Sequence, residues 1–244
     1  MRILLLSVLL PCFCLSCNRR DRELRILCGS SMAEPGQRIG NDFAKQRGVE
    51  AIFDLGGSET LLPRILAGVD ADIFICHDPF EQKVKDAGQW AGSVAVGTMR
   101  PVLLVKKGNP KKIGSVADLG RSGLKIGVGR PDTSTCGKMF VDMLEKRGLY
   151  PQVQPQILLE GRGHVEIANG LTEGPLDAAV VWNLVAVMYK DKVEIVPDSF
   201  RYDPIRVTVV GLKQGANPAL RDQFLKMCDT PQVKSIFQKF GYTD

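Results

Sequence analysis

Histidine is scarce in this sequence, and its cysteines lack the spacing of a metal site. The 244 residues contain two histidines, His77 and His164, so a histidine-rich metal centre is excluded. The cysteines that follow residue 17 are Cys28, Cys76, Cys136 and Cys228. Their separations match no zinc-binding pattern, and two of them end apolar segments, where a small buried thiol is common. We therefore expect free thiols and no bare metal cation.

The sequence also lacks a strong excess of one charge. Its 32 basic and 27 acidic residues give a formal net charge of +5, and the two signs are scattered among each other. Proteins that bind nucleic acid concentrate their basic residues in a patch or stripe, so we expect no nucleic-acid partner. A hydrophobic fraction of 44% and a charged fraction of 24% are typical of a globular chain with a buried core.

The apolar run near the N-terminus is too short to span a bilayer as a helix. It covers residues 3–10 behind Arg2, which is typical of the core of a signal peptide. Cys17 then resembles the lipidated cysteine of bacterial lipoprotein signals. We expect residues 1–17 to be a lipoprotein signal peptide, and the mature chain to be exported and lipid-anchored to the membrane, facing the periplasm or the extracellular side. Plain secretion and a retained anchor are the alternatives.

Strands and helices alternate beyond residue 24, in two similar runs. In the first run we expect strands at 24–28, 49–55 and 72–76 and helices at 33–47 and 59–67. In the second run we expect strands at 125–128, 156–159 and 177–182 and helices at 137–147 and 164–171. Apolar strands that alternate with helices predict an α/β fold whose sheets are mainly parallel and flanked by helices.

Two further strands are placed where the chain would pass from one run to the other. They are expected at 101–105 and 205–211, before two closing helices at 218–228 and 231–240. Two lobes joined by two crossing strands form a cleft, and ligands favour such clefts at the carboxyl ends of strands. We expect one lobe to comprise residues 18–101 and 206–244, and the other to comprise residues 102–205.

Four loops combine glycine with hydroxyl residues where a strand passes into a helix. They are Gly29-Ser30-Ser31, Gly56-Gly57-Ser58, the stretch 132–136 and the stretch 161–164. A helix start presents unpaired N–H groups and a partial positive charge, so such loops can bind an anion without Lys or Arg. Capping explains the hydroxyl residues but not the glycines, which let backbone approach a ligand closely. The four loops therefore predict an anion site in the cleft.

These segments resemble the periplasmic molybdate-binding proteins of ABC transporters. The resemblance covers residues 24–243 and rests on "RILCGSSM", "GGSETLLPRILAG" followed by "ADIFICHD", "GRPDTSTCGK", "LDAAVVW" and "SIFQKFGY". It implies a two-lobed type II periplasmic-binding-protein-like fold that captures a tetrahedral oxyanion, molybdate or tungstate, for uptake. It also implies an ABC permease and its ATPase as partners, a monomer, no cofactor and no enzymatic activity.

The resemblance implies which residues hold the oxyanion. Ser31 and Ser58 would supply hydroxyl and amide donors from the first lobe. In the second lobe, Cys136 and His164 would contribute backbone N–H groups. Trp182 stands where the family carries a tyrosine whose hydroxyl donates, and its indole N–H could replace that donor.

Five neighbouring residues are expected to support this site: Ser30, Gly57, Glu59, Thr135 and Arg162. Glu59 stands where the family commonly has a small hydroxyl residue. A carboxylate there would repel a dianion but accept the proton of an anion such as hydrogen phosphate; alternatively it faces water from the first helical turn. Arg162 either reaches the ligand or is solvated.

Three other interpretations remain open at this point. The ligand could be another oxyanion, such as phosphate or sulfate. Cys136 and His164 could form the nucleophile pair of a cysteine-dependent enzyme, since a helix start lowers the pKa of a thiol. A ferric-ion binding protein is disfavoured because that chemistry uses neighbouring tyrosines, and the four tyrosines of this chain are not adjacent.

Overall fold

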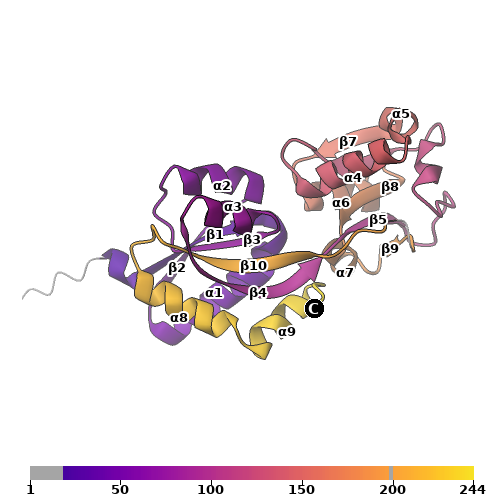
Figure 1. Ribbon diagram of the computed structural model, residues 1–244. Coiled ribbons are helices and arrows are strands. Elements are labelled where there is room, and N and C mark those ends of the chain that lie inside the picture. The colour runs from indigo at the N-terminus through magenta and orange to yellow at the C-terminus, as the bar shows by residue number, and fades with distance from the viewer. Residues whose placement is uncertain (1–18, 198–199) are drawn as a thin grey trace, which may run out of the picture.

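The computed structural model describes residues 19–197 and 200–244 and shows two lobes, each built on one five-stranded sheet (Figure 1). The strand order is β2-β1-β3-β10-β4 in the first sheet and β7-β6-β8-β5-β9 in the second. The expected signal peptide at 1–17, with lipidation at Cys17, lies outside the described residues. Within the described ranges, no helix is long and apolar enough to cross a membrane.

The first lobe contains β1, β2, β3, β4 and β10. The bounds of these strands are Glu23–Gly29, Glu50–Gly56, Ile73–His77, Trp90–Met99 and Ile205–Leu212. Its helices are η1 (Arg19–Arg22), η2 (Ser30–Met32), α1 (Ala33–Arg47), α2 (Ser58–Leu66), α3 (Phe80–Asp86), α8 (Pro218–Cys228) and α9 (Pro231–Lys239). Figure 1 shows α8 and α9, in yellow, on the same lobe as the N-terminal strands, so the two ends of the described chain share this lobe.

The second lobe contains β5, β6, β7, β8 and β9. The bounds of these strands are Pro101–Lys106, Ile126–Gly129, Ile157–Gly161, Ala178–Trp182 and Val193–Ile195. Its helices are η3 (Ala117–Gly120), α4 (Thr135–Lys146), α5 (Tyr150–Val153), η4 (Gln154–Gln156), α6 (His164–Thr172) and α7 (Leu184–Met188).

Both sheets are mixed rather than mainly parallel. In the first, β1 pairs in parallel with β2 and β3, while β10 pairs antiparallel with β3 and β4. The second repeats this pattern, with β6 parallel to β7 and β8, and β5 antiparallel to β8 and β9. The antiparallel pairs arise because β5 and β10 belong to the segments that bring the chain from one lobe to the other. Two α/β lobes with two crossings confirm the predicted fold class.

The chain passes between the sheets at two places. One is Arg100, between β4 and β5, and the other lies between β9 and β10 (Figure 1). The side chain of Asn183 links both lobes beside the first crossing. Its Oδ1 accepts from the N–H of Arg100 at 2.8 Å, and its Nδ2 donates to the carbonyl of Gly241 at 2.7 Å.

Apolar side chains fill both lobes, as the sequence pattern predicts. The strands β3 and β8 are buried along their whole length, and α1 buries Ile39 and Phe43 against the first sheet. The ring of Phe43 packs edge-on against Phe224 of α8, with centroids 5.2 Å apart. All four cysteines beyond residue 17 are buried free thiols in the described chain. The α1 helix ends at Gly48 in the left-handed conformation, at φ 64°, which glycine adopts readily.

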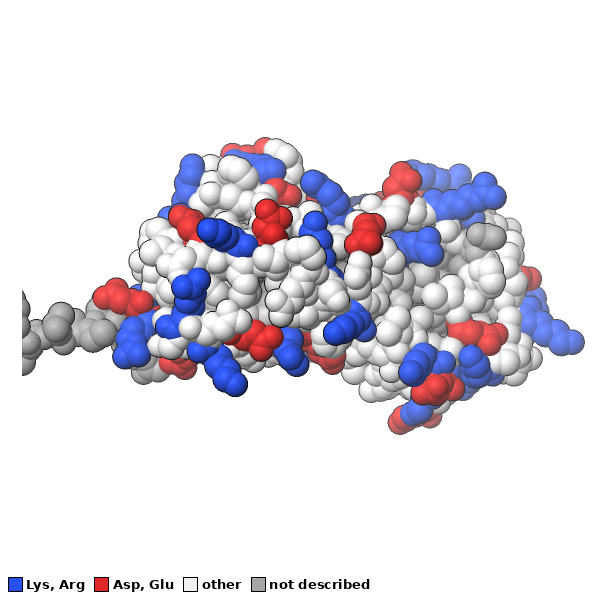
Figure 2. Space-filling model, turned by 90° about the horizontal axis from the view of Figure 1, so that it is seen from below, with Lys and Arg blue, Asp and Glu red and all other residues white. Residues whose placement is uncertain are grey.

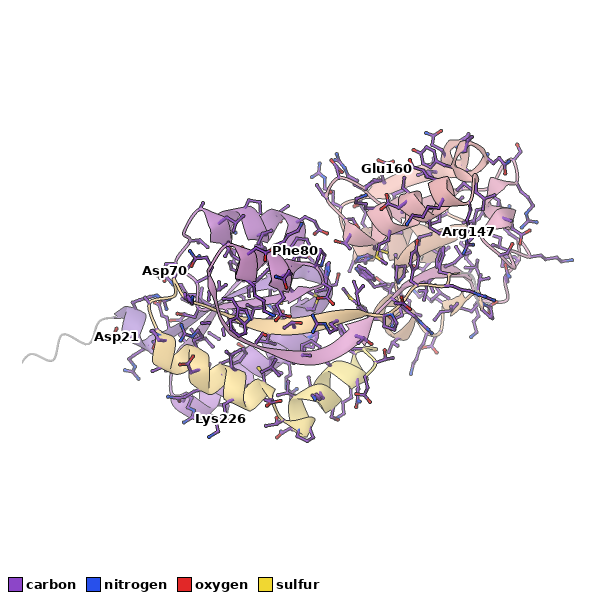
Figure 3. The ribbon with its side chains drawn as sticks, in the orientation of Figure 1. Asp21, Asp70, Phe80, Arg147, Glu160 and Lys226 are labelled. Carbon is purple, nitrogen blue, oxygen red and sulfur yellow. The ribbon has the colours of Figure 1, made fainter. Side chains whose placement is uncertain are left out.

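Charged side chains are interspersed on the surface. Figure 2 shows basic and acidic groups mixed over both lobes on the face seen from below. Labelled residues of both signs occur in Figure 3, with Asp21, Asp70 and Lys226 on the first lobe and Arg147 and Glu160 on the second. This mixing agrees with the scattered charges of the sequence.

Candidate functional site

Six strands, three from each lobe, end at one cavity. The residues at or next to these strand ends that line it are Gly29, Gly57, His77, Gly129, Gly161 and Trp182. The cavity has a volume of about 50 Å³. This is room for on the order of a few water molecules, so it suits a compact ligand rather than a large organic one.

Three helices begin at this cavity. The first residues of α2, α4 and α6 are Ser58, Thr135 and His164, and all three line it. A helix start carries unpaired N–H groups and a partial positive charge. Arg162 is the one Lys or Arg among the described residues that line the cavity. The groups of this cavity that could attract an anion are therefore mainly helix starts rather than cationic side chains.

The hydroxyl of Ser58 is buried without a hydrogen-bond partner among the described residues. The residue is 2% exposed, and it lines the cavity. A Cβ placed on Gly29 would lie 3.0 Å from Ser58 Oγ, so the hydroxyl lies close beside the glycine that ends β1. A buried polar group without a partner costs ~1–3 kcal/mol, which a ligand that hydrogen-bonds to it would recover.

The loop after β1 is held by the C-terminal segment. The hydroxyl of Tyr242 donates to the backbone carbonyl of Ser31. Ser30 is exposed and Ser31 half-buried, and both line the cavity.

The start of α4 is pressed against the end of β6. Ser134 caps the helix, its Oγ accepting from the N–H of Gly137 at 3.2 Å. A Cβ on Gly137 would lie 1.9 Å from the carbonyl oxygen of Gly129, so only glycine allows this approach. The contact places the N–H of Thr135 at the cavity.

Cys136 turns its side chain into the core of the second lobe. It is fully buried and is absent from the described residues that line the cavity. Burial raises the pKa of its thiol well above the ordinary range, so the group stays protonated. This contradicts the interpretation of Cys136 as a nucleophile activated by a helix start.

His164, at the start of α6, brings an imidazole to the part of the cavity wall formed by the second lobe. The residue is partly exposed, but its Nδ1 is buried and has no hydrogen-bond partner in the described ranges. The centroid of its ring lies 6.0 Å from the centroid of the Trp182 ring. Burial, followed by the nearby His77, lowers the pKa of His164 to about 4, so the imidazole is neutral near pH 7.

His77 belongs to the cavity wall although the sequence interpretation did not include it. Its Nδ1 lies 2.7 Å from the carbonyl oxygen of Asp78, and because a carbonyl only accepts, Nδ1 carries the proton. Burial lowers the pKa of His77 as well. The ring packs against Phe80, labelled in Figure 3, with centroids 5.2 Å apart. In the sequence, the place of His77 at the end of a buried strand was the signal that could have indicated its role in the cavity.

Glu59 reaches across the cleft. Its Oε1 accepts from the backbone N–H of Thr135 at 2.7 Å and from the hydroxyl of the same residue. The interpretation in which Glu59 simply faces water is therefore wrong. By contrast, Arg162 is exposed, and its backbone N–H donates to Glu166 within the second lobe at 2.9 Å.

The structure thus brings together most of the residues singled out from the sequence. Those that line the cavity are Ser30, Ser31, Gly57, Ser58, Glu59, Thr135, Arg162, His164 and Trp182. Cys136 is not among them; it follows Thr135 at the second position of α4. Across residues 19–197 and 200–244, no cluster of three or more His, Cys, Asp or Glu side chains is arranged to hold a metal ion.

Comparisons with known proteins agree with this architecture. Residues 24–243 match the family described as bacterial extracellular solute-binding protein. The molybdate-binding protein ModA of Mycobacterium tuberculosis is 29% identical over 227 residues, which cover 91% of this chain and 84% of the relative. A putative binding protein of Haemophilus influenzae is 24% identical over 221 residues, covering 90% of each chain.

A solved structure shares the fold. The periplasmic molybdate-binding protein of Azotobacter vinelandii superposes with a TM-score of 0.75 at 18% identity, covering 91% of this chain and 99% of its own. At this identity the likeness concerns the fold alone.

Proposed function

Because this chain belongs to the family of bacterial extracellular solute-binding proteins, we propose that it captures a tetrahedral oxyanion, molybdate or tungstate, between its lobes for uptake by an ABC transporter. The observation that carries the proposal is the buried hydroxyl of Ser58, which has no hydrogen-bond partner in the part of the chain that the structure describes and lines a small cavity where three helices begin. The compact size of the cavity, the partial positive charge of the helix starts and this buried hydroxyl together favour a small anion. The molybdate-binding relatives support the choice of anion.

Each part of the cavity has a proposed role. Ser31 and Ser58 would donate hydroxyl and amide hydrogens from the first lobe. The backbone N–H groups of Cys136 and His164 would donate from the starts of α4 and α6, and the indole N–H of Trp182 would add a donor from the end of β8. Such a donor set stabilises negative charge without neutralising it, which permits release as well as capture.

Capture would proceed by closure of the two lobes about their crossings. In this proposal residues 18–101 and 206–244 move as one lobe and residues 102–205 as the other. Closure removes the anion from water, where hydrogen bonds and helix dipoles act more strongly. Selection against sulfate would follow from cavity size, because sulfate is smaller at the same charge.

The proposed setting is outside the cytoplasm, with the mature chain anchored through a lipid on Cys17. The closed monomer would deliver its anion to a permease and its ATPase. We infer a binding protein rather than an enzyme, and the buried, protonated thiol of Cys136 supports this inference.

One observation favours a second candidate, a protonated oxyanion such as hydrogen phosphate. The carboxylate of Glu59 lines the cavity and could accept the ligand's proton, whereas it would repel a dianion.

Elemental analysis tests the proposal. The purified protein is incubated with molybdate or, in a parallel sample, with phosphate, freed of unbound anion by gel filtration, and analysed for molybdenum and phosphorus per chain. We expect stoichiometric molybdenum in the wild-type protein and little in the double variant Ser31→Ala/Ser58→Ala. Retention of phosphate instead would favour the second candidate, and retention of neither anion would contradict both.

A further inference from the structure

The hydrogen-bond donors at the start of α4 are bound by a carboxylate of the protein itself. Both the N–H and the hydroxyl of Thr135 donate to one carboxylate oxygen of Glu59. Glu59 is 76 positions away in the chain and belongs to the other lobe. A carboxylate at a helix start is favoured by the unpaired N–H groups and the partial positive charge there. Glu59 therefore occupies the place that an anionic ligand would take on this helix.

Two other polar groups of the cavity, on Ser58 and His164, make no hydrogen bond to Glu59. The hydroxyl of Ser58 and Nδ1 of His164 are buried at the same cavity and have no hydrogen-bond partners among the described residues. Ser58 is 2% exposed. Part of the cavity wall thus presents unpaired polar groups, while the donors of Thr135 are already taken by the protein's own carboxylate.

The backbone around Glu59 brings the lobes close together. A Cβ on Gly57 would lie 3.1 Å from Oε2 of Glu59 and 3.6 Å from the carbonyl oxygen of Thr133 in the second lobe. The glycine leaves space for the side chain of Glu59 to reach the second lobe from the first turn of α2.

We propose that Glu59 is a specificity-determining residue that acts as an internal anion, holding the second lobe through Thr135 until a ligand displaces it. The competition with ligand rests on the proposed function, whereas the hold on the lobes does not depend on which anion binds. Two consequences follow. The ligand-free protein spends more time closed than it would without this carboxylate, and a dianion binds more weakly than the rest of the cavity would allow.

Small-angle X-ray scattering of the ligand-free protein tests the hold on the lobes. The variant Glu59→Ala should have a larger radius of gyration than the wild type, because the lobes lose this connection. Glu166→Ala is the matched control, since Glu166, in the first turn of α6, also accepts a backbone N–H, but from Arg162 of the same lobe. An unchanged radius of gyration for Glu59→Ala, with thermal unfolding showing a folded protein, would overturn the proposal.

Calorimetric titration with molybdate tests the competition. Glu59→Gln keeps the size of the side chain and removes its charge, so we expect at least tenfold tighter binding than in the wild type. Weaker binding in Glu59→Gln would show that the carboxylate supports the ligand rather than competing with it, and would overturn the competition. If the wild type binds no oxyanion, the proposed function fails, and the scattering experiment still decides whether Glu59 holds the lobes.

Discussion

The indole of Trp182 and the imidazole of His77 lie side by side across the boundary between the lobes, with ring centroids 5.7 Å apart and planes tilted by 57°. Trp182 ends β8 in the second lobe, and His77 ends β3 in the first. Trp182 also contacts His164, at 6.0 Å between centroids. A tryptophan stands here where the family resemblance implies a tyrosine, and its larger ring packs near two neutral imidazoles.

Replacing Trp182 with Phe separates packing from hydrogen bonding. Phe keeps an aromatic ring but removes the indole N–H, so we expect oxyanion affinity to fall by ~1–3 kcal/mol if that N–H donates to the ligand. Stability should change less than in Trp182→Ala, which leaves a cavity and should cost ~3–5 kcal/mol. Calorimetry and urea unfolding measure the two quantities. Unchanged affinity in Trp182→Phe would mean that Trp182 contributes packing only.

Ser58→Ala should have opposite effects on stability and on binding. Without ligand, the variant loses a buried hydroxyl that has no partner within residues 19–197 and 200–244, so the free energy of unfolding should stay equal or rise by about 1 kcal/mol. With ligand, it lacks a donor, so affinity should fall by ~1–3 kcal/mol. Ser115→Ala, which removes the hydroxyl of an exposed residue bonded to Asp118, is the control. Loss of stability together with unchanged affinity would remove Ser58 from the site.

Gly137→Ala should displace the start of α4. Its Cβ would lie 1.9 Å from the carbonyl oxygen of Gly129, and backbone at that distance must move. We expect a loss of at least ~1–3 kcal/mol of stability, as for other overpacked sites, and weaker oxyanion binding. Gly114→Ala is the control, because a Cβ on Gly114 would lie 3.7 Å from its nearest atom beyond the adjoining residues, which is an ordinary contact. A variant as stable as the wild type would show that the two segments are not held as closely as described.

Stability should decline as the pH falls from 6.5 towards 4. The folded pKa of His164 is about 4 against an ordinary 6.5, so in this interval the unfolded chain binds a proton that the folded protein does not. The contribution is at most ~3 kcal/mol, because part of the residue contacts solvent. His164→Asn should lose less stability between pH 7 and pH 4.5 in urea unfolding. Equal losses in both proteins would show that His164 titrates normally.

The helices that the sequence predicted best have clear local signals. The range 33–47 was predicted for α1 and is observed as Ala33–Arg47, because Gly48 marks its end. The range 218–228 likewise coincides with α8, where Pro218 opens the helix and Asn217 caps it. In both cases the residues that set the boundary are neighbours in the chain.

The strand β4 had no comparable signal. Gly92 and Gly97 interrupt its pattern, and its pairing with β10 contains two register shifts. A strand that bends in this way does not alternate apolar and polar residues regularly, so its sequence is not typical of a strand.

At the site, the loops could be predicted and the contacts between them could not. Glycine and hydroxyl residues at strand ends are visible in the sequence, which is why Ser58 and Thr135 were singled out. The bond between Glu59 and Thr135 joins residues 76 positions apart and depends on how the lobes meet. His77 was missed for the same reason, since its neighbours Trp182 and His164 come from the other lobe.

We propose that the cavity at Ser58 holds a tetrahedral oxyanion of the size of molybdate. The decisive measurement is calorimetric titration of the purified protein with molybdate, tungstate, sulfate and phosphate in one buffer. We expect tight binding of molybdate and tungstate, little heat with sulfate, and loss of binding in Ser31→Ala/Ser58→Ala. Silence towards molybdate and tungstate, or binding that survives the double substitution unchanged, would contradict it.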